Sequence, residues 1–318
     1  MKTGVDKMTG TEGGGRLTVH VLEPIHEEAL ARLRAKVDLV TAEDASVKQW
    51  HETADAIIVR NHAVDESDIR RASRLKVIGK HGAGTDTIDT ETAASLGIPV
   101  VSTPGVNAES VADLALAMAL SLARDLMGHT LALQKGEPLT GKRRVGYEVA
   151  ELPAGIIGLG AIGKAVAARL QLGFGAEVTA YDPGIPADAW PEGIKRAETL
   201  GELLATTRLL FLHVGLNEKT RNMIGAEELA MLPENAFLVN CARGGVVDEA
   251  ALAEALSRGR LAGAASDVFV EEPPSSDLPL LQQPGFLATP HIGASTQEGL
   301  RRTGHEVVSK VLDALGIE

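Results

Sequence analysis

The sequence feature that most constrains the fold is a set of glycines at the end of an apolar run. Residues 154–157 lead directly into Gly158, Gly160 and Gly163, which are spaced as G-x-G-x-x-G, and a segment rich in Ala and Val follows. A strand, a tight glycine turn and a helix N-terminus in this order form the turn that holds the diphosphate of a dinucleotide. Gly158 would make the turn, Gly160 would let the backbone approach the diphosphate, and Gly163 would let the helix pack closely on the strand.

A second strand with an acidic end supports that interpretation, because three glycines alone are weak evidence. Residues 177–181 form a short strand-like run that ends at Asp182, about 20 residues after Gly160. In dinucleotide-binding domains an acid at this distance accepts hydrogen bonds from the hydroxyls of the adenosine ribose. Asp182 therefore predicts NAD as the cofactor, since its carboxylate would repel the 2′-phosphate of NADP.

Composition describes an ordinary globular chain with an excess of acid. The chain has 318 residues, of which 44% are hydrophobic and 23% charged, and this fits about two folded domains. The formal net charge of −12 and the lack of a dense Lys/Arg run argue against a nucleic-acid partner. The single cysteine, Cys241, excludes an internal disulfide and a cysteine zinc cage, and we interpret it as a small buried residue in a reducing compartment.

No segment indicates export or membrane insertion. No apolar run reaches the roughly 18 residues that a membrane helix needs. Residues 1–16 are mostly polar or glycine and lack the apolar core of a signal peptide. We therefore expect a flexible N-terminus at 1–16 that is neither signal peptide nor anchor, no membrane partner, and a cytoplasmic protein.

The remaining chain alternates short β-branched runs with amphipathic, helix-like segments. This alternation predicts an α/β protein with two doubly wound parallel sheets, each covered by helices on both faces. In the first half the expected strands are 17–22, 54–60, 76–79 and 100–102, and the expected helices are 27–36, 65–72 and 87–94. In the second half the expected strands are 154–157, 177–181, 208–214, 236–240, 262–266 and 286–288, and the expected helices are 200–205, 226–231, 249–258 and 295–315.

One expected helix, over residues 111–124, carries Ala, Leu and Met on nearly every side. A helix that is apolar all round is buried. We interpret it as a connector between domains or as part of a subunit interface, and it predicts a homodimer built on the second domain. The polar stretch 135–144 is expected to be a surface segment.

Three polar residues are candidates for catalysis because each follows an expected strand, at the sheet edge where α/β proteins bind ligands. Arg243 follows the strand 236–240 and could grip a carboxylate through two parallel hydrogen bonds. His291 follows the strand 286–288 and could transfer a proton near neutral pH, while Glu272 could bond the second imidazole nitrogen and so fix the tautomer. The alternatives are a salt bridge at a helix end for Arg243, a hydrogen-bonded loop histidine for His291 and a solvated turn carboxylate for Glu272.

Taken together, these motifs make the chain resemble the NAD-dependent D-isomer-specific 2-hydroxyacid dehydrogenases, and most of all the branch of D-3-phosphoglycerate dehydrogenase and hydroxypyruvate reductase. The resemblance extends over nearly everything after Leu17. The segments that carry it are 158–163 with Asp182, 240–248, 267–273 and 290–295, and in the N-terminal half 76–86, 103–107 and 110–112. It implies a substrate-binding domain formed by 17–106 and 295–318, closed by the C-terminal helix, and an NAD-binding Rossmann domain formed by 107–294.

The resemblance also implies a role for each candidate residue, with the substrate between the two domains. Arg243 would hold the substrate carboxylate and polarise the carbonyl, His291 would pass the proton, and Glu272 would orient the imidazole. The substrate would further be bound by Arg60 and by backbone N–H groups of the loop Gly82, Ala83 and Gly84. Positions that line the cofactor in the family are matched here by Gly158, Gly160, Ala161, Ile162, Gly163, Asp182, Cys241, Ala242, Arg243, Asp267, His291 and Gly293.

Several positions depart from the family pattern. Ala161 stands where many members have an arginine that contacts the diphosphate, Gly215 where many have proline, and Thr87 where asparagine is frequent. The chain ends soon after His291, so an additional C-terminal regulatory domain is not expected.

The expected substrate is a short 2-hydroxy acid with a polar or anionic tail, such as 3-phosphoglycerate or glycerate with hydroxypyruvate as its oxidised form. Arg60 lies where phosphoglycerate-type relatives carry an arginine facing the substrate, and the chain is only 3% aromatic. The alternative for Arg60 is an ordinary surface charge.

No metal is expected, because Arg243 and His291 would activate the carbonyl. Formate dehydrogenase resembles this fold but has glutamine at the position of Glu272, so Glu272 argues against that activity. The other alternative is an NAD-sensing, corepressor-like binding protein, and a measurement of turnover would distinguish it from an enzyme.

Overall fold

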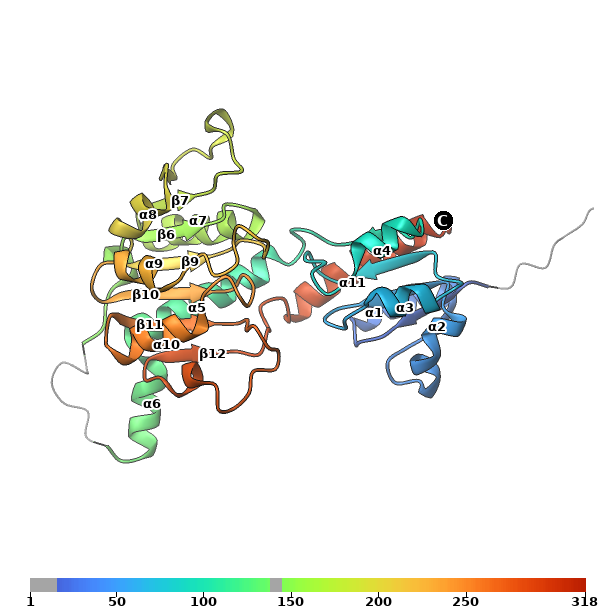
Figure 1. Ribbon diagram of the computed structural model, residues 1–318, viewed down its shortest axis with the longest axis horizontal. Coiled ribbons are helices and arrows are strands. Elements are labelled where there is room, and N and C mark those ends of the chain that lie inside the picture. The colour runs from blue at the N-terminus through green and yellow to red at the C-terminus, as the bar shows by residue number, and fades with distance from the viewer. Residues whose placement is uncertain (1–15, 138–144) are drawn as a thin grey trace, which may run out of the picture. The chain divides into compact units, whose positions relative to one another are not determined.

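The computed structural model describes residues 16–137 and 145–318, and this part of the chain divides into two compact units (Figure 1). Unit 1 contains the described residues up to Thr103 together with Thr303–Glu318, and unit 2 is Pro104–Arg302. The last helix, α11 (Gln297–Ala314), therefore begins in unit 2 and ends in unit 1. The N-terminus expected to be flexible and most of the polar segment 135–144 lie outside the described residues.

Unit 1 has a five-stranded parallel sheet in its described residues, with the order β2-β1-β3-β4-β5. Its strands are β1 (Thr18–Val21), β2 (Asp38–Val40), β3 (Ala56–Val59), β4 (Val77–Lys80) and β5 (Val100–Val101). Its helices are α1 (Glu27–Lys36), α2 (Trp50–Thr53), α3 (Glu66–Arg71) and α4 (Thr90–Ser95), joined by α11 and a short 3₁₀ helix at Ala45–Gln49.

Unit 2 has a seven-stranded parallel sheet in its described residues, with the order β12-β11-β10-β9-β6-β7-β8. Its strands are β6 (Ala154–Ile157), β7 (Val178–Tyr181), β8 (Lys195–Arg196), β9 (Leu209–Leu212), β10 (Ala236–Asn240), β11 (Leu261–Ser266) and β12 (Phe286–Ala288). Its helices are α5 (Ala108–Arg124), α6 (Leu126–Gln134), α7 (Ala161–Phe174), α8 (Leu200–Thr206), α9 (Ala226–Met231) and α10 (Glu249–Ser257). Short 3₁₀ helices lie at Val149–Glu151, Ala187–Ala189 and Pro279–Gln282.

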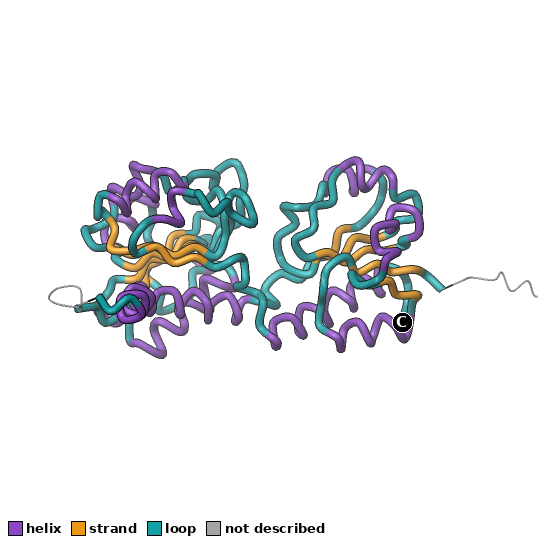
Figure 2. Tube along the Cα trace, turned by 90° about the horizontal axis from the view of Figure 1, so that it is seen from below, coloured by secondary structure: helices purple, strands orange, loops and turns teal. Residues whose placement is uncertain are grey.

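Each sheet separates two apolar cores, so helices cover both of its faces (Figure 2). In unit 2 one core packs β-strand residues against α5 and α7, and the other packs them against α8, α9 and α10. In unit 1 one core contains α1 and the apolar side of α11, and the other contains α2, α3 and α4. The predicted α/β class with two doubly wound parallel sheets is confirmed.

The strand order places a topological switch point in each sheet. In unit 2 the chain runs outward from β6 through β7 to β8 on one side, and from β9 through β10 and β11 to β12 on the other. Loops leaving β6 and β9 therefore diverge at the carboxyl edge, and it is at such a switch point that open α/β sheets bind ligands. In unit 1 the corresponding point lies between β1 and β3.

Strands β2 and β8, helices α2 and α6 and the short 3₁₀ helices were not predicted. Strands β2 and β8 contain three and two residues and include charged side chains, so neither is an apolar run. Helix α6 follows α5 after a single residue, Asp125, whose left-handed conformation (φ +45°) ends the first helix and redirects the chain.

Helix α5 is largely buried, as predicted. Its side chains Ala112, Ala115, Met118 and Ala119 are at most 1% exposed and lie in the core of unit 2 itself. Helix α6 of the same unit carries exposed apolar side chains as well: Leu126 is 56% exposed and Leu133 is 70% exposed. The homodimer built on the second domain stays a prediction.

Among the helices of the described ranges, none is both long enough and apolar enough to span a membrane.

Candidate active site

The glycine turn after β6 has the geometry that a dinucleotide diphosphate requires. Gly158 has φ +89°, and a Cβ on it would lie 2.5 Å from the carbonyl oxygen of His213. A Cβ on Gly163 would lie 2.1 Å from the carbonyl oxygen of Gly158, so only glycine lets α7 begin so close to the strand. At Gly160, by contrast, a Cβ would meet nothing within 4 Å, which leaves the backbone open to an approaching diphosphate at the N-terminus of α7.

Asp182 at the end of β7 is tied to this turn. Its Oδ2 accepts a hydrogen bond from Leu159 N at 2.8 Å, and its Oδ1 accepts one from Gly184 N at 2.9 Å. A carboxylate can accept about four hydrogen bonds, so this one can also bind ribose hydroxyls. The structure thus brings Asp182 together with Gly158, Gly160 and Gly163 on the edge beside the switch point.

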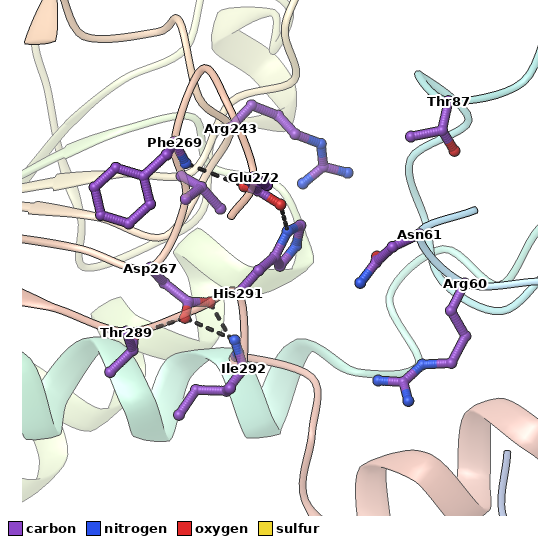
Figure 3. Close-up of polar contacts among 12 residues, drawn as sticks. Arg60, Asn61, Thr87, Arg243, Asp267, Phe269, Glu272, Thr289, His291 and Ile292 are labelled. Atoms are coloured by element: carbon purple, nitrogen blue, oxygen red, sulfur yellow. Dashed lines mark hydrogen bonds and ion pairs between the residues drawn. The ribbon is translucent and has the colours of Figure 1, made fainter. Parts of the chain in front are cut away.

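The three candidate catalytic side chains also meet at the carboxyl edge of the unit 2 sheet. Glu272 Oε2 lies 2.7 Å from His291 Nδ1, and the two side chains are 34% and 33% exposed. The other oxygen of Glu272 accepts from Phe269 N at 3.0 Å. Figure 3 shows the guanidinium of Arg243 beside this pair. The expected contact between Glu272 and His291 is therefore present.

Glu272 is held in its ionised form by its surroundings. Burial alone would raise the pKa of Glu272, but the hydrogen bonds from His291 and Phe269 N, and the positive charges of His291 and Arg243, lower it below the ordinary value. A negative Glu272 favours the tautomer of His291 that carries its proton on Nδ1 and donates it to the carboxylate.

Two glycines after β10 explain why Arg243 can lie so near Glu272. A Cβ on Gly244 would lie 1.8 Å from the carbonyl oxygen of Phe269, so glycine lets the two loops touch through their backbones. Gly245 has φ +79°, which favours glycine as well. The Arg243 guanidinium donates to Ala242 O at 2.7 Å, and the Arg243 carbonyl accepts from Asn240 Nδ2 at 3.3 Å.

His291 has an unusual backbone conformation that Asp267 holds in place. Its φ is +53°, a left-handed conformation that is uncommon outside glycine. Its N–H donates to the carbonyl oxygen of Asp267 at 2.7 Å. The buried Asp267 carboxylate then accepts from Ile292 N at 2.7 Å, from Gly293 N at 2.8 Å and from Thr289 Oγ1 at 2.6 Å, contacts that Figure 3 shows in part.

This use of Asp267 was missed at the sequence level. Asp267 was expected only to line the cofactor, yet both of its oxygens are engaged by the loop that carries His291. The sequence does show an acidic residue directly after strand β11. The loop that Asp267 binds, however, follows strand β12, and only the pairing of β11 with β12 shows that the two segments are neighbours.

Two further residues of the predicted cofactor set are buried. Cys241 is 6% exposed and its Sγ lies 3.9 Å from Met118 Sδ, so its side chain faces the core and only its backbone remains for a cofactor. Burial, with the nearby charge of Asp267, raises the pKa of the Cys241 thiol, which keeps it protonated. Ala242 is 4% exposed. Among the described residues, no group of three or more His, Cys, Asp or Glu could hold a metal.

The substrate residues predicted from the N-terminal half lie in unit 1. Gly82 N belongs to the loop that is predicted to bind the substrate carboxylate, and it donates a hydrogen bond to Thr103 Oγ1 at 3.0 Å. Substrate binding by this loop stays a prediction, and the N–H groups of Ala83 and Gly84 are the donors that it now depends on. Arg60 follows β3 and donates from Nη1 to Pro24 O at 3.2 Å.

Comparisons with known proteins agree with this geometry. Residues 116–293 match the model of the NAD-binding domain of the D-isomer specific 2-hydroxyacid dehydrogenases. The chain is 40% identical over 300 residues to D-3-phosphoglycerate dehydrogenase of Methanocaldococcus jannaschii, covering 93% of this chain but 57% of that protein. It is 39% identical over 314 residues to hydroxypyruvate reductase of Thermotoga maritima, covering 95% of this chain and 99% of that one.

A solved structure extends the likeness to the whole fold. D-Lactate dehydrogenase of Aquifex aeolicus, complexed with NAD and lactic acid, matches with a TM-score of 0.82 and 29% identity, covering 94% of this chain and 95% of that chain. The chain spans little more than half the length of the phosphoglycerate dehydrogenases that it matches. The glycine turn with Asp182, the three polar side chains on one sheet edge and these matches lead to one conclusion: the chain belongs to the D-isomer specific 2-hydroxyacid dehydrogenases.

Proposed function

We propose that this protein is an NAD-dependent dehydrogenase that interconverts a small, polar 2-hydroxy acid and its 2-keto acid. The observation that carries the proposal is the Glu272–His291 pair, 2.7 Å apart, beside Arg243 on the carboxyl edge of a sheet that begins with a dinucleotide turn. Unit 2 would then be the NAD-binding domain and unit 1 the substrate-binding domain.

Bound NAD(H) would supply or accept the hydride. In the direction of reduction, Arg243 would hold the carboxylate of the keto acid through its guanidinium and polarise the carbonyl. His291 would donate a proton from Nε2 to the carbonyl oxygen, since Nδ1 faces Glu272. The ionised Glu272 would stabilise the protonated ring before transfer and keep it oriented afterwards.

We propose NAD rather than NADP because of Asp182. Its carboxylate lies beside the diphosphate turn and would accept from the two ribose hydroxyls, whereas a 2′-phosphate would be repelled. The family match to an NAD-binding domain supports this choice.

We propose hydroxypyruvate with glycerate, or phosphohydroxypyruvate with 3-phosphoglycerate, as the substrate class. The names of the two relatives, a hydroxypyruvate reductase and a phosphoglycerate dehydrogenase, support short polar acids. Within unit 1 the side chain at the end of β3 is Arg60, which suits a polar or anionic tail, and only 3% of the chain is aromatic.

The test is a panel of 2-keto acids assayed by NADH oxidation with the wild type and Arg60→Ala. We expect hydroxypyruvate or phosphohydroxypyruvate to give the highest kcat/KM, and Arg60→Ala to raise KM for that acid. If phenylpyruvate or ketoisocaproate were turned over faster, the polar-substrate proposal would be wrong.

The same panel with NADPH should give much lower kcat/KM, and equal efficiency with both cofactors would contradict the role of Asp182. A complete lack of turnover would favour an NAD-sensing binding protein.

A homodimer and a cytoplasmic location stay predictions.

A further inference from the structure

A carboxylate of unit 1 lies against the loop that carries Arg60. Glu23 follows β1 and residues 60–62 follow β3, and these two strands are parallel neighbours, so both segments leave the sheet at the same edge. Leu22 N donates to Ile58 O at 3.0 Å, which extends the pairing up to Glu23. This edge lies at the switch point of the unit 1 sheet, where an α/β sheet binds its ligand.

Three consecutive backbone N–H groups converge on Glu23. Its Oε2 accepts from Arg60 N at 2.5 Å, from Asn61 N at 2.8 Å and from His62 N at 2.9 Å, and its Oε1 accepts from Asn61 N at 3.0 Å. Successive N–H groups that point at one anion form a nest. Because the anion here is a side chain of the same unit, it determines the conformation of residues 60–62.

The electrostatics of the nest keep Glu23 charged. Burial alone would raise the pKa of Glu23, but the N–H groups of residues 60–62 and the charge of Arg60 lower it below the ordinary value. Hydrogen bonds to a charged acceptor are about twice as strong as neutral ones, so an ionised Glu23 holds the loop far better than a neutral group would.

The same neighbourhood fixes the rest of Arg60. The buried ammonium of Lys80, on β4, donates to the Arg60 carbonyl oxygen and, at 3.2 Å, to Thr87 Oγ1. The Arg60 guanidinium donates to Pro24 O at 3.2 Å, directly after Glu23. The backbone N–H, the backbone carbonyl and the guanidinium of Arg60 are thus each hydrogen-bonded within unit 1.

We propose that Glu23 is a positioning residue for substrate binding: it holds residues 60–62 so that the side chains of Arg60 and Asn61 face the ligand. This inference rests on the proposed function, in which unit 1 binds the polar tail of the keto acid. Figure 3 shows both side chains projecting from this loop, and Asn61 is exposed. The hydrogen bonds of Glu23 described above come from the backbone N–H groups of residues 60–62, so Glu23 would act through Arg60 and Asn61 rather than on the substrate.

The experiment measures kcat and KM for the best substrate of the panel, together with the Kd of NADH, for four proteins: wild type, Glu23→Gln, Arg60→Ala and the double variant. A glutamine side chain is about as large as that of Glu23, but it is uncharged, and its amide NH2 group would face the N–H donors of residues 60–62. We expect kcat/KM of Glu23→Gln to fall about tenfold, chiefly through KM, with the Kd of NADH unchanged. In the Arg60→Ala background the same change should have a clearly smaller effect, since coupled residues are not additive.

Two further variants keep the test decisive. Glu23→Asp keeps the charge on a shorter side chain and should fall between wild type and Glu23→Gln. Glu27→Gln, a few residues along on the exposed face of α1, is the matched control and should leave kcat/KM unchanged.

The outcomes separate this inference from the function on which it rests. If the wild type turned over none of the keto acids, the proposed function and the inference would fail together. If the wild type were active but Glu23→Gln stayed within twofold of it, or if the losses simply multiplied in the double variant, the inference alone would be wrong. It would also be wrong if both Glu23 variants lost the cooperative unfolding of the wild type, because the role of Glu23 would then be structural.

Discussion

At the scale of single residues, carboxylates that are buried or partly buried bind the backbone of the loops that carry the proposed chemistry. Asp267 accepts from two successive N–H groups after His291, and Asp182 accepts from Leu159 N in the glycine turn. Holding a non-glycine residue at positive φ costs on the order of 1–3 kcal/mol. In His291 that cost is offset by the charge-assisted bonds to Asp267, and the imidazole is presented to Glu272 as a result.

The role of His291 is testable by substitution. We expect His291→Gln to lower turnover by about 10²–10⁴-fold, because the proton donor is lost. The Kd of NADH should stay near the wild-type value, since the glycine turn and Asp182 are untouched. Glu272→Gln should be milder, because the imidazole is still present but less well oriented. Steady-state kinetics and NADH fluorescence titration measure these effects, and near wild-type turnover in the His291 variant would show that the assignment is wrong.

At the scale of elements, prediction succeeded where a segment has a clear boundary, even in a strand as short as β12. Helices α1 and α9 and strands β10 and β12 have the limits that the sequence predicts. Strands β2 and β8 were missed because the neighbouring strand, and not a pattern of their own, makes them extended. Helix α5 was correctly judged buried, but only the packed structure shows that its own unit buries it.

We propose helix α6 as the interface of the predicted homodimer. Leu126, Met127, Leu131 and Leu133 on this nine-residue helix are 56%, 51%, 46% and 70% exposed. We expect a second copy of the chain to cover this surface, because burying an exposed leucine contributes about 1.5–3 kcal/mol. The double change Leu131→Glu and Leu133→Glu should therefore weaken a dimer by at least about tenfold.

Light scattering and sedimentation at micromolar concentration measure this effect. The matched control is Leu172→Glu, on α7 of the same unit, where the side chain is 90% exposed and the change should not alter the oligomeric state. A wild type that is monomeric, or a dimer insensitive to the α6 changes, would contradict the prediction.

At the scale of the whole molecule, each unit has its own sheet and its own pair of cores, and buried ionisable groups make its stability depend on pH. Both ring nitrogens of His213, directly after β9, are buried and hydrogen-bond to no described residue. Burial lowers the pKa of His213 to about 3. At pH values between about 3 and the ordinary histidine pKa, His213 is therefore neutral in the folded chain but protonated in the unfolded chain. The free energy of unfolding decreases as the pH falls through this range.

This loss of stability should be visible before the carboxylates titrate. Between about pH 6.5 and pH 4.5 we expect the free energy of unfolding of unit 2 to fall by up to about 1.4 kcal/mol per pH unit. His213→Leu should flatten this slope, whereas His62→Gln, at an exposed position of unit 1, should not. Urea unfolding followed by Trp190 fluorescence in a Trp50→Phe background reports on unit 2 alone, because the chain has two tryptophans and Trp50 lies in unit 1. An unchanged slope in the His213 variant would refute the assignment.

The sequence by itself determined the α/β class, the dinucleotide turn and the family, because these depend on local patterns: glycines at fixed spacing, an acid at a strand end, and short motifs in order. Only the tertiary structure decided how these residues are held in place. The contact between Glu272 and His291 was expected, but Asp267 holds the loop after β12 and Glu23 holds residues 60–62 because parallel strands distant in sequence lie side by side. Within each unit, strand order brings the paired loops to the same edge of the sheet, and no spacing along the chain encodes that order.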